Sequence, residues 1–181
     1  IPAGFGSHFN AAAAIMHVYK DQLYVGTWNT PLGSLKSPHR KGCEIWRTSD
    51  GMHWEQVVGH NAPFTSGGFG NPDNTGAWSI ETFNDYLYIG TMNWDFSDNG
   101  GCEVWRSNDG VHWEQIVDHG FRSFMNTSST EKEAINTYAW NMEEYQGQLY
   151  MGTFNSRVWL RDEEGTGCQL WRKKKKKNWE K

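Results

Sequence analysis

Hydrophobic residues along this chain occur in short runs that Gly, Asn and Asp residues interrupt. No window of a dozen residues shows uninterrupted apolar spacing at i, i+3, i+4 and i+7, which is the pattern of an amphipathic helix. The runs are rich in aromatic and β-branched residues, which favour strands. The pattern therefore predicts an all-β protein of many short strands, with a minor content of helix.

One of these runs occurs three times, in constant order with two other segments. The run has the pattern Leu-Tyr-x-Gly-Thr-x-Asn, and its copies begin 64 and 62 residues apart. An Asn-x-x-Ala segment precedes each copy, and a Gly-Cys-x-x-Trp-Arg segment follows it. The runs occupy 23–29, 87–93 and 149–155, and the segments that follow them occupy 42–47, 101–106 and 167–172. Three copies of a unit of about 62 residues therefore account for one domain, 1–181, with units near 1–58, 59–117 and 118–181.

Each unit is expected to contain four antiparallel strands. The first strand spans 13–19, 77–83 or 139–145, and a Lys-Asp, Asn-Asp or Gln-Gly turn joins it to the Leu-Tyr run. The Cys-x-x-Trp-Arg segment forms the third strand, and a Trp-Glu segment opens the fourth. Four short antiparallel strands are typical of a β-propeller blade. We therefore predict an all-β fold with three four-stranded blades, which belong to a propeller of six to eight blades.

Three blades are not expected to stand alone. Propellers close with 4–8 blades, and an open segment would expose sheet faces rich in Trp and Tyr to water. The sequence begins at Ile1, and its last strand stops at Lys181, earlier than the corresponding strands of the other units. We therefore expect further blades as partners, from the same protein or from a second copy, with six as the expected total.

The turn between the third and fourth strands has the pattern Ser/Thr-x-Asp-Gly-x-x-Trp in the first two units. In such a turn the Asp side chain caps backbone N–H groups, and Gly adopts positive φ. The pattern resembles a short form of the Asp-box of BNR-type propellers such as sialidases, and the resemblance implies a propeller fold in which the box is a structural turn. Its residues here are Asp50, Gly51, Trp54, Asp109, Gly110 and Trp113. The Phe/Tyr-Arg-Ile-Pro signature of sialidases does not occur in the sequence, which argues against sialidase activity in this chain.

The third unit departs from this pattern at 173–177, where lysines replace the Asp-Gly turn without changing the number of residues. Lysine supplies neither the Asp cap nor the Gly conformation. Either the turn is rebuilt as a solvated basic loop, or the recorded sequence differs from the true one at this point. A nucleic-acid or heparin patch agrees less well with the run, because no aromatic or Arg residue lies between the lysines.

Charge and cysteine content exclude several classes of function. A net charge of −4 and a pI near 6.0 give no general attraction to nucleic acid or to anionic membranes. Cys43, Cys102 and Cys168 take the same position in successive units, too far apart for disulfides, so we expect free buried thiols. No spacing typical of a zinc site occurs. We expect no cofactor, metal, nucleic-acid partner or membrane insertion, and an extracellular, cell-surface or periplasmic location.

Candidate ligand-binding residues lie near the expected channel mouth, where innermost strands and their connecting loops converge. The first strand of each unit is the expected innermost strand. Its Asn side chains suit sugar hydroxyls, and its Trp rings suit the apolar face of a sugar. The same Asn residues are equally consistent with turns, and the Trp residues with blade core. The candidates are Asn10, Asn74, Asn136, Trp78, Trp140, Trp28, Asn29, Asn93 and Asn155.

Two functions are consistent with these residues. The main hypothesis is a non-catalytic binding module that recognises carbohydrate or another polar extracellular ligand at the channel mouth, or that scaffolds an assembly. The alternative is a glycan-processing enzyme, a glycoside hydrolase or lyase, whose catalytic carboxylates are Glu81 and Glu143 or lie on further blades. Paired carboxylates of glycosidases lie roughly 5–5.5 or 6.5–9.5 Å apart, so the relative placement of these two side chains distinguishes the hypotheses.

Overall fold

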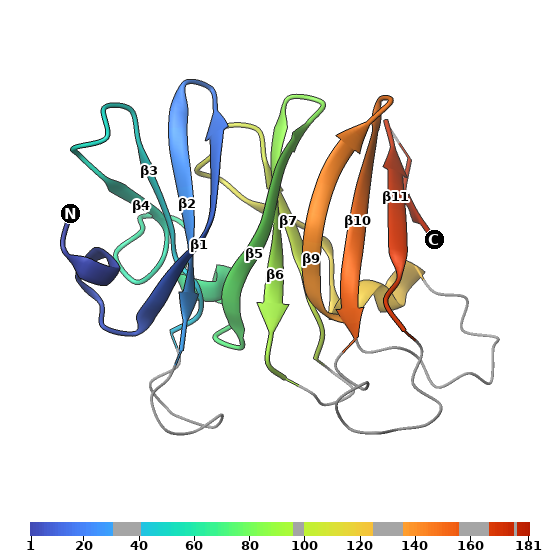
Figure 1. Ribbon diagram of the computed structural model, residues 1–181, viewed down its shortest axis with the longest axis horizontal. Helices are drawn as coiled ribbons and strands as arrows, with labels where there is room; N and C mark the ends of the chain where they lie inside the picture. The colour runs from blue at the N-terminus through green and yellow to red at the C-terminus, as the bar shows by residue number, and fades with distance from the viewer. Residues whose placement is uncertain (31–40, 96–99, 125–135, 156–166, 176) are drawn as a thin grey trace.

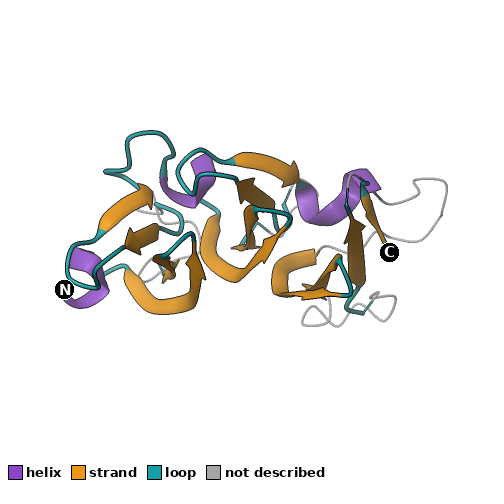
Figure 2. Ribbon diagram, turned by 90° about the horizontal axis from the view of Figure 1, so that it is seen from above, coloured by secondary structure: helices purple, strands orange, loops and turns teal. Residues whose placement is uncertain are grey.

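A computed structural model of the chain describes residues 1–30, 41–95, 100–124, 136–155, 167–175 and 177–181. The described strands form three successive units of four, which lie next to one another along the molecule (Figures 1 and 2). Unit 1 contains β1 (Asn10–Tyr19), β2 (Gln22–Asn29), β3 (Ile45–Thr48) and β4 (Glu55–Val58). Unit 2 contains β5 (Asn74–Phe83), β6 (Tyr86–Asn93), β7 (Val104–Ser107) and β8 (Glu114–Val117). Unit 3 contains β9 (Asn136–Tyr145), β10 (Gln148–Asn155), β11 (Leu170–Lys174) and β12 (Trp179–Glu180).

Within each unit every strand pairs antiparallel with the next strand in the sequence. Single residue pairs also join neighbouring units, Trp28 with Gly76 and Met92 with Tyr138. The described strands therefore form one continuous antiparallel sheet rather than three separate sheets. The first strands β1, β5 and β9 contact one another in succession and make up one side of the molecule.

The predicted turns between the first and second strands are confirmed. Lys20 and Asp21 both adopt positive φ, 48° and 57°, and Asn84 and Asp85 do the same. This is the conformation of a two-residue hairpin turn that matches the twist of its strands. Each first strand begins three residues earlier than predicted, at the repeated Asn, because that Asn still pairs with the last residue of the following strand.

The hydrophobic core lies between units, where the strands of one unit pack face to face on those of the next. One cluster fills the junction of units 1 and 2, and its most buried members include Tyr24, Ile45, Leu87 and Ile89. A second cluster fills the junction of units 2 and 3, with Tyr88, Val104, Met142, Leu149 and Met151. The positions of Tyr24 and Ile45 in unit 1 are those of Tyr88 and Val104 in unit 2, so the two junctions use the same positions of the repeat.

Short 3₁₀ turns precede the first strand of each unit: η1 (Ala3–Gly6), η2 (Gly67–Gly70) and η3 (His119–Phe124). Each contains a Phe with positive φ that stacks on the Trp of the third strand, as Phe69 does on Trp105 at 5.1 Å between ring centroids. In unit 3, Phe121 also meets Trp179 edge to face at 5.4 Å, as Phe69 meets Trp113 in unit 2. The lysine-rich turn therefore preserves the register of the fourth strand. None of the helical segments in the described part of the chain is long and apolar enough to span a membrane.

The three cysteines are free, but they do not share one environment. Cys43 and Cys102 are fully buried, and burial raises the pKa of the Cys43 thiol to about 12. Cys168 is exposed, contrary to the expectation of three buried thiols. The difference arises because unit 2 covers Cys43 and unit 3 covers Cys102, whereas none of the described residues covers Cys168 in this way.

Candidate functional site

Five aromatic side chains form a cluster that spans all three units. Trp78 lies at its centre, with ring centroids 6.0 Å from Trp28, 5.4 Å from Tyr138 and 5.8 Å from Trp140. Phe154 completes it, 5.6 Å from Trp140 and 5.2 Å from Tyr138. Trp140 is 47% exposed, so the cluster presents an aromatic surface to solvent. We call these five residues the aromatic cluster.

Two β-bulges in the first strands β5 and β9 determine where the side chains of Trp78 and Trp140 point. The pairing of β5 with β6 shifts between Ala77 and Ser79, and Trp78 is the extra residue at that shift. Trp140 occupies the corresponding shift in β9, next to Ala139. A β-bulge leaves its extra residue unpaired and redirects its side chain, which explains why both rings project from the sheet. Unit 1 has a small residue at the same point, and Trp28 from β2 extends the cluster instead.

The repeated Asn residues lie inside the units rather than at the surface of the cluster. Asn74 is fully buried; its amide nitrogen donates to the Gly68 carbonyl at 3.0 Å, and its oxygen accepts from Thr91 and Asn93. Asn10 and Asn136 make the corresponding bonds in their own units. The Asn residues at the ends of the second strands, Asn29, Asn93 and Asn155, are also buried. Of the candidate ligand residues, the structure thus brings together the three Trp, and it places the six Asn in hydrogen-bonded interiors.

A polar pair in the third strand supports this arrangement, and the sequence analysis did not identify it. The indole N–H of Trp46 donates to the carboxylate of Glu44 at 3.0 Å, and Trp105 donates to Glu103 at 2.8 Å. Trp171 donates to the amide oxygen of Gln169, at 3.1 Å. Because a neutral amide replaces the carboxylate in unit 3 without changing the contact, these buried groups act as hydrogen-bond acceptors in the fold. The recurrence of Glu, Glu and Gln at one position was the available signal.

Glu81 and Glu143 occupy equivalent positions in β5 and β9, but they do not face each other. Glu81 pairs across the sheet with Tyr88, a member of the core between units 2 and 3, so its side chain lies on the face toward unit 3. In β9 it is Met142 that belongs to this core. Successive residues point to opposite faces of a strand, so Glu143 points away from unit 2, and it is exposed.

The residue that shares a junction with Glu81 is Glu144. At the junction of units 1 and 2, the His17 ring nitrogen lies 2.8 Å from the Thr82 hydroxyl. The counterparts of these two residues at the next junction are Glu81 and Glu144. Glu144 pairs with Leu149, which belongs to the core between units 2 and 3, so its side chain lies on the face toward unit 2. Glu81 and Glu144 therefore lie on the strand faces that meet at this junction, and Glu144, like Glu143, is exposed.

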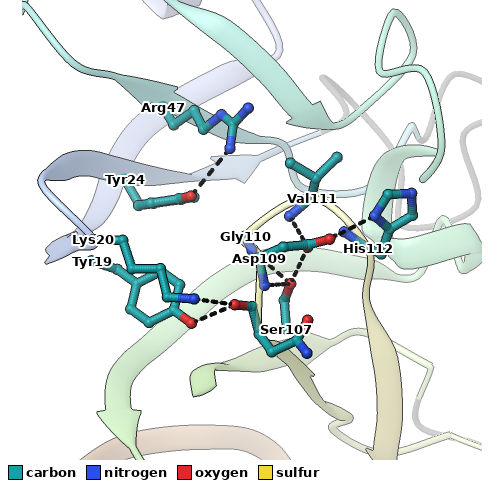
Figure 3. A network of polar contacts seen from close by, with 10 residues as sticks. Tyr19, Lys20, Tyr24, Arg47, Ser107, Asp109, Gly110, Val111 and His112 are labelled. Carbon is teal, nitrogen blue, oxygen red and sulfur yellow. Dashed lines mark hydrogen bonds and ion pairs between the residues drawn. The ribbon is translucent and has the colours of Figure 1, made fainter. Parts of the chain in front are cut away.

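The Asp-Gly turns form as their residues predict. Asp109 accepts hydrogen bonds from the backbone N–H groups of Val111 and His112, both at 2.8 Å, and Gly110 adopts a φ of 76° (Figure 3). Asp50 makes the same contacts in unit 1, and its hydrogen bonds with His53 hold its pKa below the usual range. These turns lie at the outer part of the units, and they are structural.

Two further features bear on ligand binding. A cleft of about 280 Å³ in unit 1 is lined by polar and aromatic side chains that include Glu44, Trp46, Gln56 and His60. The Glu44 carboxylate within it already accepts bonds from Asn10 and Trp46. Among the residues that the structure describes, no group of three or more His, Cys, Asp or Glu could hold a metal ion.

Comparison with known proteins places the fold. No family model and no curated protein matches the chain. Solved structures that resemble it include the Fusarium graminearum α-L-arabinofuranosidase bound to an iminosugar inhibitor, with a TM-score of 0.54 and 15% identity over 92% of this chain and 46% of that one. The Bombyx mori GH32 β-fructofuranosidase matches with a TM-score of 0.50 and 16% identity over 90% and 32% of the two chains. The sucrose-6-phosphate hydrolase of Lactobacillus gasseri matches with a TM-score of 0.50 and 13% identity over 90% and 31%.

These neighbours are β-propeller glycoside hydrolases, so the propeller fold is supported. At such low identity the likeness concerns the fold alone, and the chain spans less than half the length of each neighbour. The neighbours nevertheless contradict our main hypothesis of a non-catalytic binding module, because they are enzymes that act on sugars, and they favour the alternative. Membership of the Asp-box family and the total number of blades remain predictions.

Proposed function

We propose that this chain forms part of a glycan-processing enzyme, a β-propeller glycoside hydrolase in which the aromatic cluster binds a sugar ring of the substrate. The observation that carries the proposal is the aromatic surface of the exposed Trp140 and the half-buried Trp78 and Trp28, which lies across all three units. Sugar rings have apolar C–H faces that stack on aromatic rings, and their hydroxyls require polar partners around the stack. The sugar substrates in the names of the structural neighbours support the same class of ligand.

The residues of the aromatic cluster differ in the exposed fraction of their side chains. Tyr138 is 7% exposed and packs beneath Trp78 and Trp140, and burial raises the pKa of its hydroxyl. It therefore remains a protonated phenol at neutral pH and supports the rings above it. Trp140 provides the most accessible ring, and we assign it the direct contact with sugar.

The carboxylate that we propose for acid–base chemistry is Glu81. Its side chain lies on the face toward unit 3, in the same first-strand layer as the two bulged Trp residues, and Glu144 enters the same junction from unit 3. Glycosidases use two carboxylates that flank the scissile bond, roughly 5–5.5 or 6.5–9.5 Å apart. The proposal includes a complete propeller of six to eight blades with short Asp-box turns, and an extracellular or periplasmic location.

The test uses the complete propeller that contains this chain, with a panel of chromogenic pentosides, hexosides and fructosides. We expect hydrolysis of at least one member, and quenching of tryptophan fluorescence by its unhydrolysed analogue. Trp140→Ala should weaken this binding by at least roughly tenfold, since loss of one stacking ring costs about 1–3 kcal/mol by analogy with stacked bases. The control is Phe64→Ala, an aromatic residue outside the cluster that is 64% exposed, against 47% for Trp140. Absence of hydrolysis across the panel would overturn the enzymatic proposal, and equal binding by both variants would overturn the assigned surface.

A further inference from the structure

The two junctions between units repeat one set of close contacts. Gly26 of unit 1 lies under Ala77 of unit 2, so close that a Cβ on the glycine would stand 2.7 Å from the alanine methyl. Gly90 and Ala139 repeat the contact between units 2 and 3, at 2.5 Å. We call the side of a unit that carries this glycine its trailing face, and the side that carries the alanine its leading face. Each junction thus joins a trailing face to the leading face of the next unit.

Backbone hydrogen bonds join neighbouring units in the same way at both junctions. At the first, Cys43 N–H donates to the Asn74 carbonyl at 2.8 Å, and the Cys43 carbonyl accepts from Gly68 N–H at 2.8 Å. At the second, Cys102 makes the same two bonds, at 2.7 Å to Asn136 and 2.9 Å from Gly120. Main-chain bonds at fixed positions make the junction specific in register as well as in surface.

A tyrosine hydroxyl adds a polar contact at the first junction (Figure 3). The Tyr19 hydroxyl lies 2.6 Å from the carbonyl of Asp85 and 3.0 Å from that of Asn108, both in unit 2. Lys20 Nζ donates to the same Asn108 carbonyl at 2.6 Å. Gly110 packs against the ring of Tyr24, where any side chain at 110 would collide. The Asp-Gly turn of one unit is therefore part of the surface that receives the preceding unit.

Burial shows what a completed junction does to its side chains. Ile45 and Val104, on the trailing faces of units 1 and 2, are 0% exposed. The residue at this position of unit 3 is Leu170, which is 61% exposed. Tyr145 is 60% exposed, whereas its counterpart Tyr19 is 4% exposed. The trailing face of unit 3 therefore carries the residues of a junction, and the described residues of this chain leave them exposed.

The leading face of unit 1 is open in the complementary way. Ala13 is exposed, whereas its counterparts Ala77 and Ala139 are fully buried. Met16 is 66% exposed, and its counterpart Met142 is 8% exposed within the second core cluster. Gly51, the counterpart of Gly110, has no atom within 4 Å of the place where its Cβ would stand. The trailing face of unit 3 and the leading face of unit 1 thus carry the two complementary sets of residues that meet in each junction.

We propose that the trailing face of unit 3 binds the leading face of unit 1 in a second copy of this chain, head to tail. In this junction Ala13 covers Gly152, Met16 packs against Leu170, and Cys168 pairs through its backbone with Asn10 and Gly4. The hydroxyl of Tyr145 meets the backbone of the turn that contains Gly51. The geometry continues an interface that the chain already makes twice, and two such junctions join two copies into a closed ring of six units.

The experiment measures association of the purified chain by sedimentation velocity and native mass spectrometry over a wide range of concentrations. We expect a species of two copies. Leu170→Arg on the trailing face and Met16→Arg on the leading face should each raise the dissociation constant by at least roughly tenfold, because an unpaired charge would be buried in an apolar junction. Phe64→Arg is the control, since Phe64 is 64% exposed and lies outside both faces.

Mixing the two variants identifies the head-to-tail arrangement. The Leu170→Arg chain keeps its leading face, and the Met16→Arg chain keeps its trailing face, so an equimolar mixture should form a heterodimer more tightly than either variant forms a homodimer. Both side chains are exposed, and far-ultraviolet circular dichroism checks that the variants are folded. A wild-type chain that is folded and monomeric at every concentration would overturn the proposal. A mixture that associates no better than its separate components would also overturn it, because it would indicate a symmetric face-to-face contact.

Discussion

Gly26 in unit 1 lies directly against Ala77 in unit 2, and the same relationship recurs between Gly90 and Ala139. The glycine of the Leu-Tyr-x-Gly-Thr repeat therefore serves the packing of one sheet on the next. Its φ is not in the positive region, so a side chain is excluded at this position by space and not by backbone conformation. The atoms nearest to a Cβ at Gly26 belong to Ala77 and Ile15. Those nearest to a Cβ at Gly90 are the Ser79 hydroxyl, which is hydrogen-bonded to the Ala139 carbonyl, and the buried Ala139 methyl group and carbonyl.

Gly90→Ala should lower the free energy of unfolding by about 1–3 kcal/mol, the usual cost of an extra methyl group in a packed core. Gly152→Ala is the matched control at the same position of unit 3. There the nearest group is the amide oxygen of Asn141, the free end of an exposed side chain, so the substitution should be neutral or slightly stabilising. Chemical denaturation of the three proteins at low concentration measures the difference. Equal effects at 90 and 152 would contradict the packing explanation.

Asn74→Ala should destabilise the protein by roughly 1–3 kcal/mol, because it leaves buried partners without their hydrogen bonds. The partners are the Gly68 carbonyl, the Thr91 hydroxyl and the Asn93 amide, all in the interior of unit 2. Asn141→Ala, at an exposed position of β9, provides the control and should be nearly neutral. Thermal or denaturant unfolding tests the prediction. If Asn74→Ala kept full stability but lost sugar binding, the ligand-binding interpretation of this Asn would be correct instead.

Much of the fold could be predicted from the repeat. The order of its segments identified four strands per unit, and the Lys-Asp and Asn-Asp pairs identified the hairpin turns, because local backbone preferences determine both. The function of the repeated Asn could not be inferred in this way. Its amide donates to the carbonyl of a left-handed Gly-Phe turn, six residues earlier in units 1 and 2 and 16 residues earlier in unit 3, and only the folded chain shows that the two meet.

The candidate carboxylates show a second reason why the site could not be predicted from the repeat alone. Side chains at one regularly paired position of every unit point the same way around the array, so such equivalent residues do not meet across a junction; the bulged Trp78 and Trp140 are the exception. Contacts join non-equivalent positions, as His17 and Thr82 demonstrate. The pairing of Glu81 with Glu143 assumed equivalence, and the alternation of side chains along β9 places Glu144 opposite instead. We found no catalytic motif in the sequence, which is why the proposal of an enzymatic function relies on comparison at the level of structure.

Stability should fall in acid through the Asp-Gly turns. Partial burial opposes ionisation of Asp109, but hydrogen bonds from the backbone and side chain of His112 and from Val111 outweigh it and keep the pKa of Asp109 below its ordinary value. Because the folded-state pKa is lower than the unfolded one, ionised Asp109 stabilises the fold above the unfolded pKa of about 3.9, and the contribution is lost as the pH falls further. Denaturation between pH ~5 and ~2 should therefore show a shallower loss of stability in Asp109→Asn than in wild type. Parallel pH dependences in the two proteins would refute this role.

The last prediction separates the two carboxylate pairs, and it rests on the proposed enzymatic function. Glu81→Gln should lower kcat/KM on the hydrolysed glycoside by about 10²–10⁴-fold, the usual contribution of a general acid or base. Glu144→Gln should also reduce it, since its side chain enters the same junction. Glu143→Gln should have a much smaller effect, because Glu143 is exposed on the opposite face of β9.

The three substitutions remove one carboxylate each and preserve side-chain size, so differences among them report position. The pH dependence of kcat/KM provides a second measurement, because removal of an acid or base should abolish one limb of the profile, whereas a purely structural effect should scale it uniformly. Denaturation of each variant checks that stability is retained. A large loss in Glu143→Gln with little change in Glu81→Gln would show that the acting carboxylate lies on the open face of unit 3, where a further blade would complete the site.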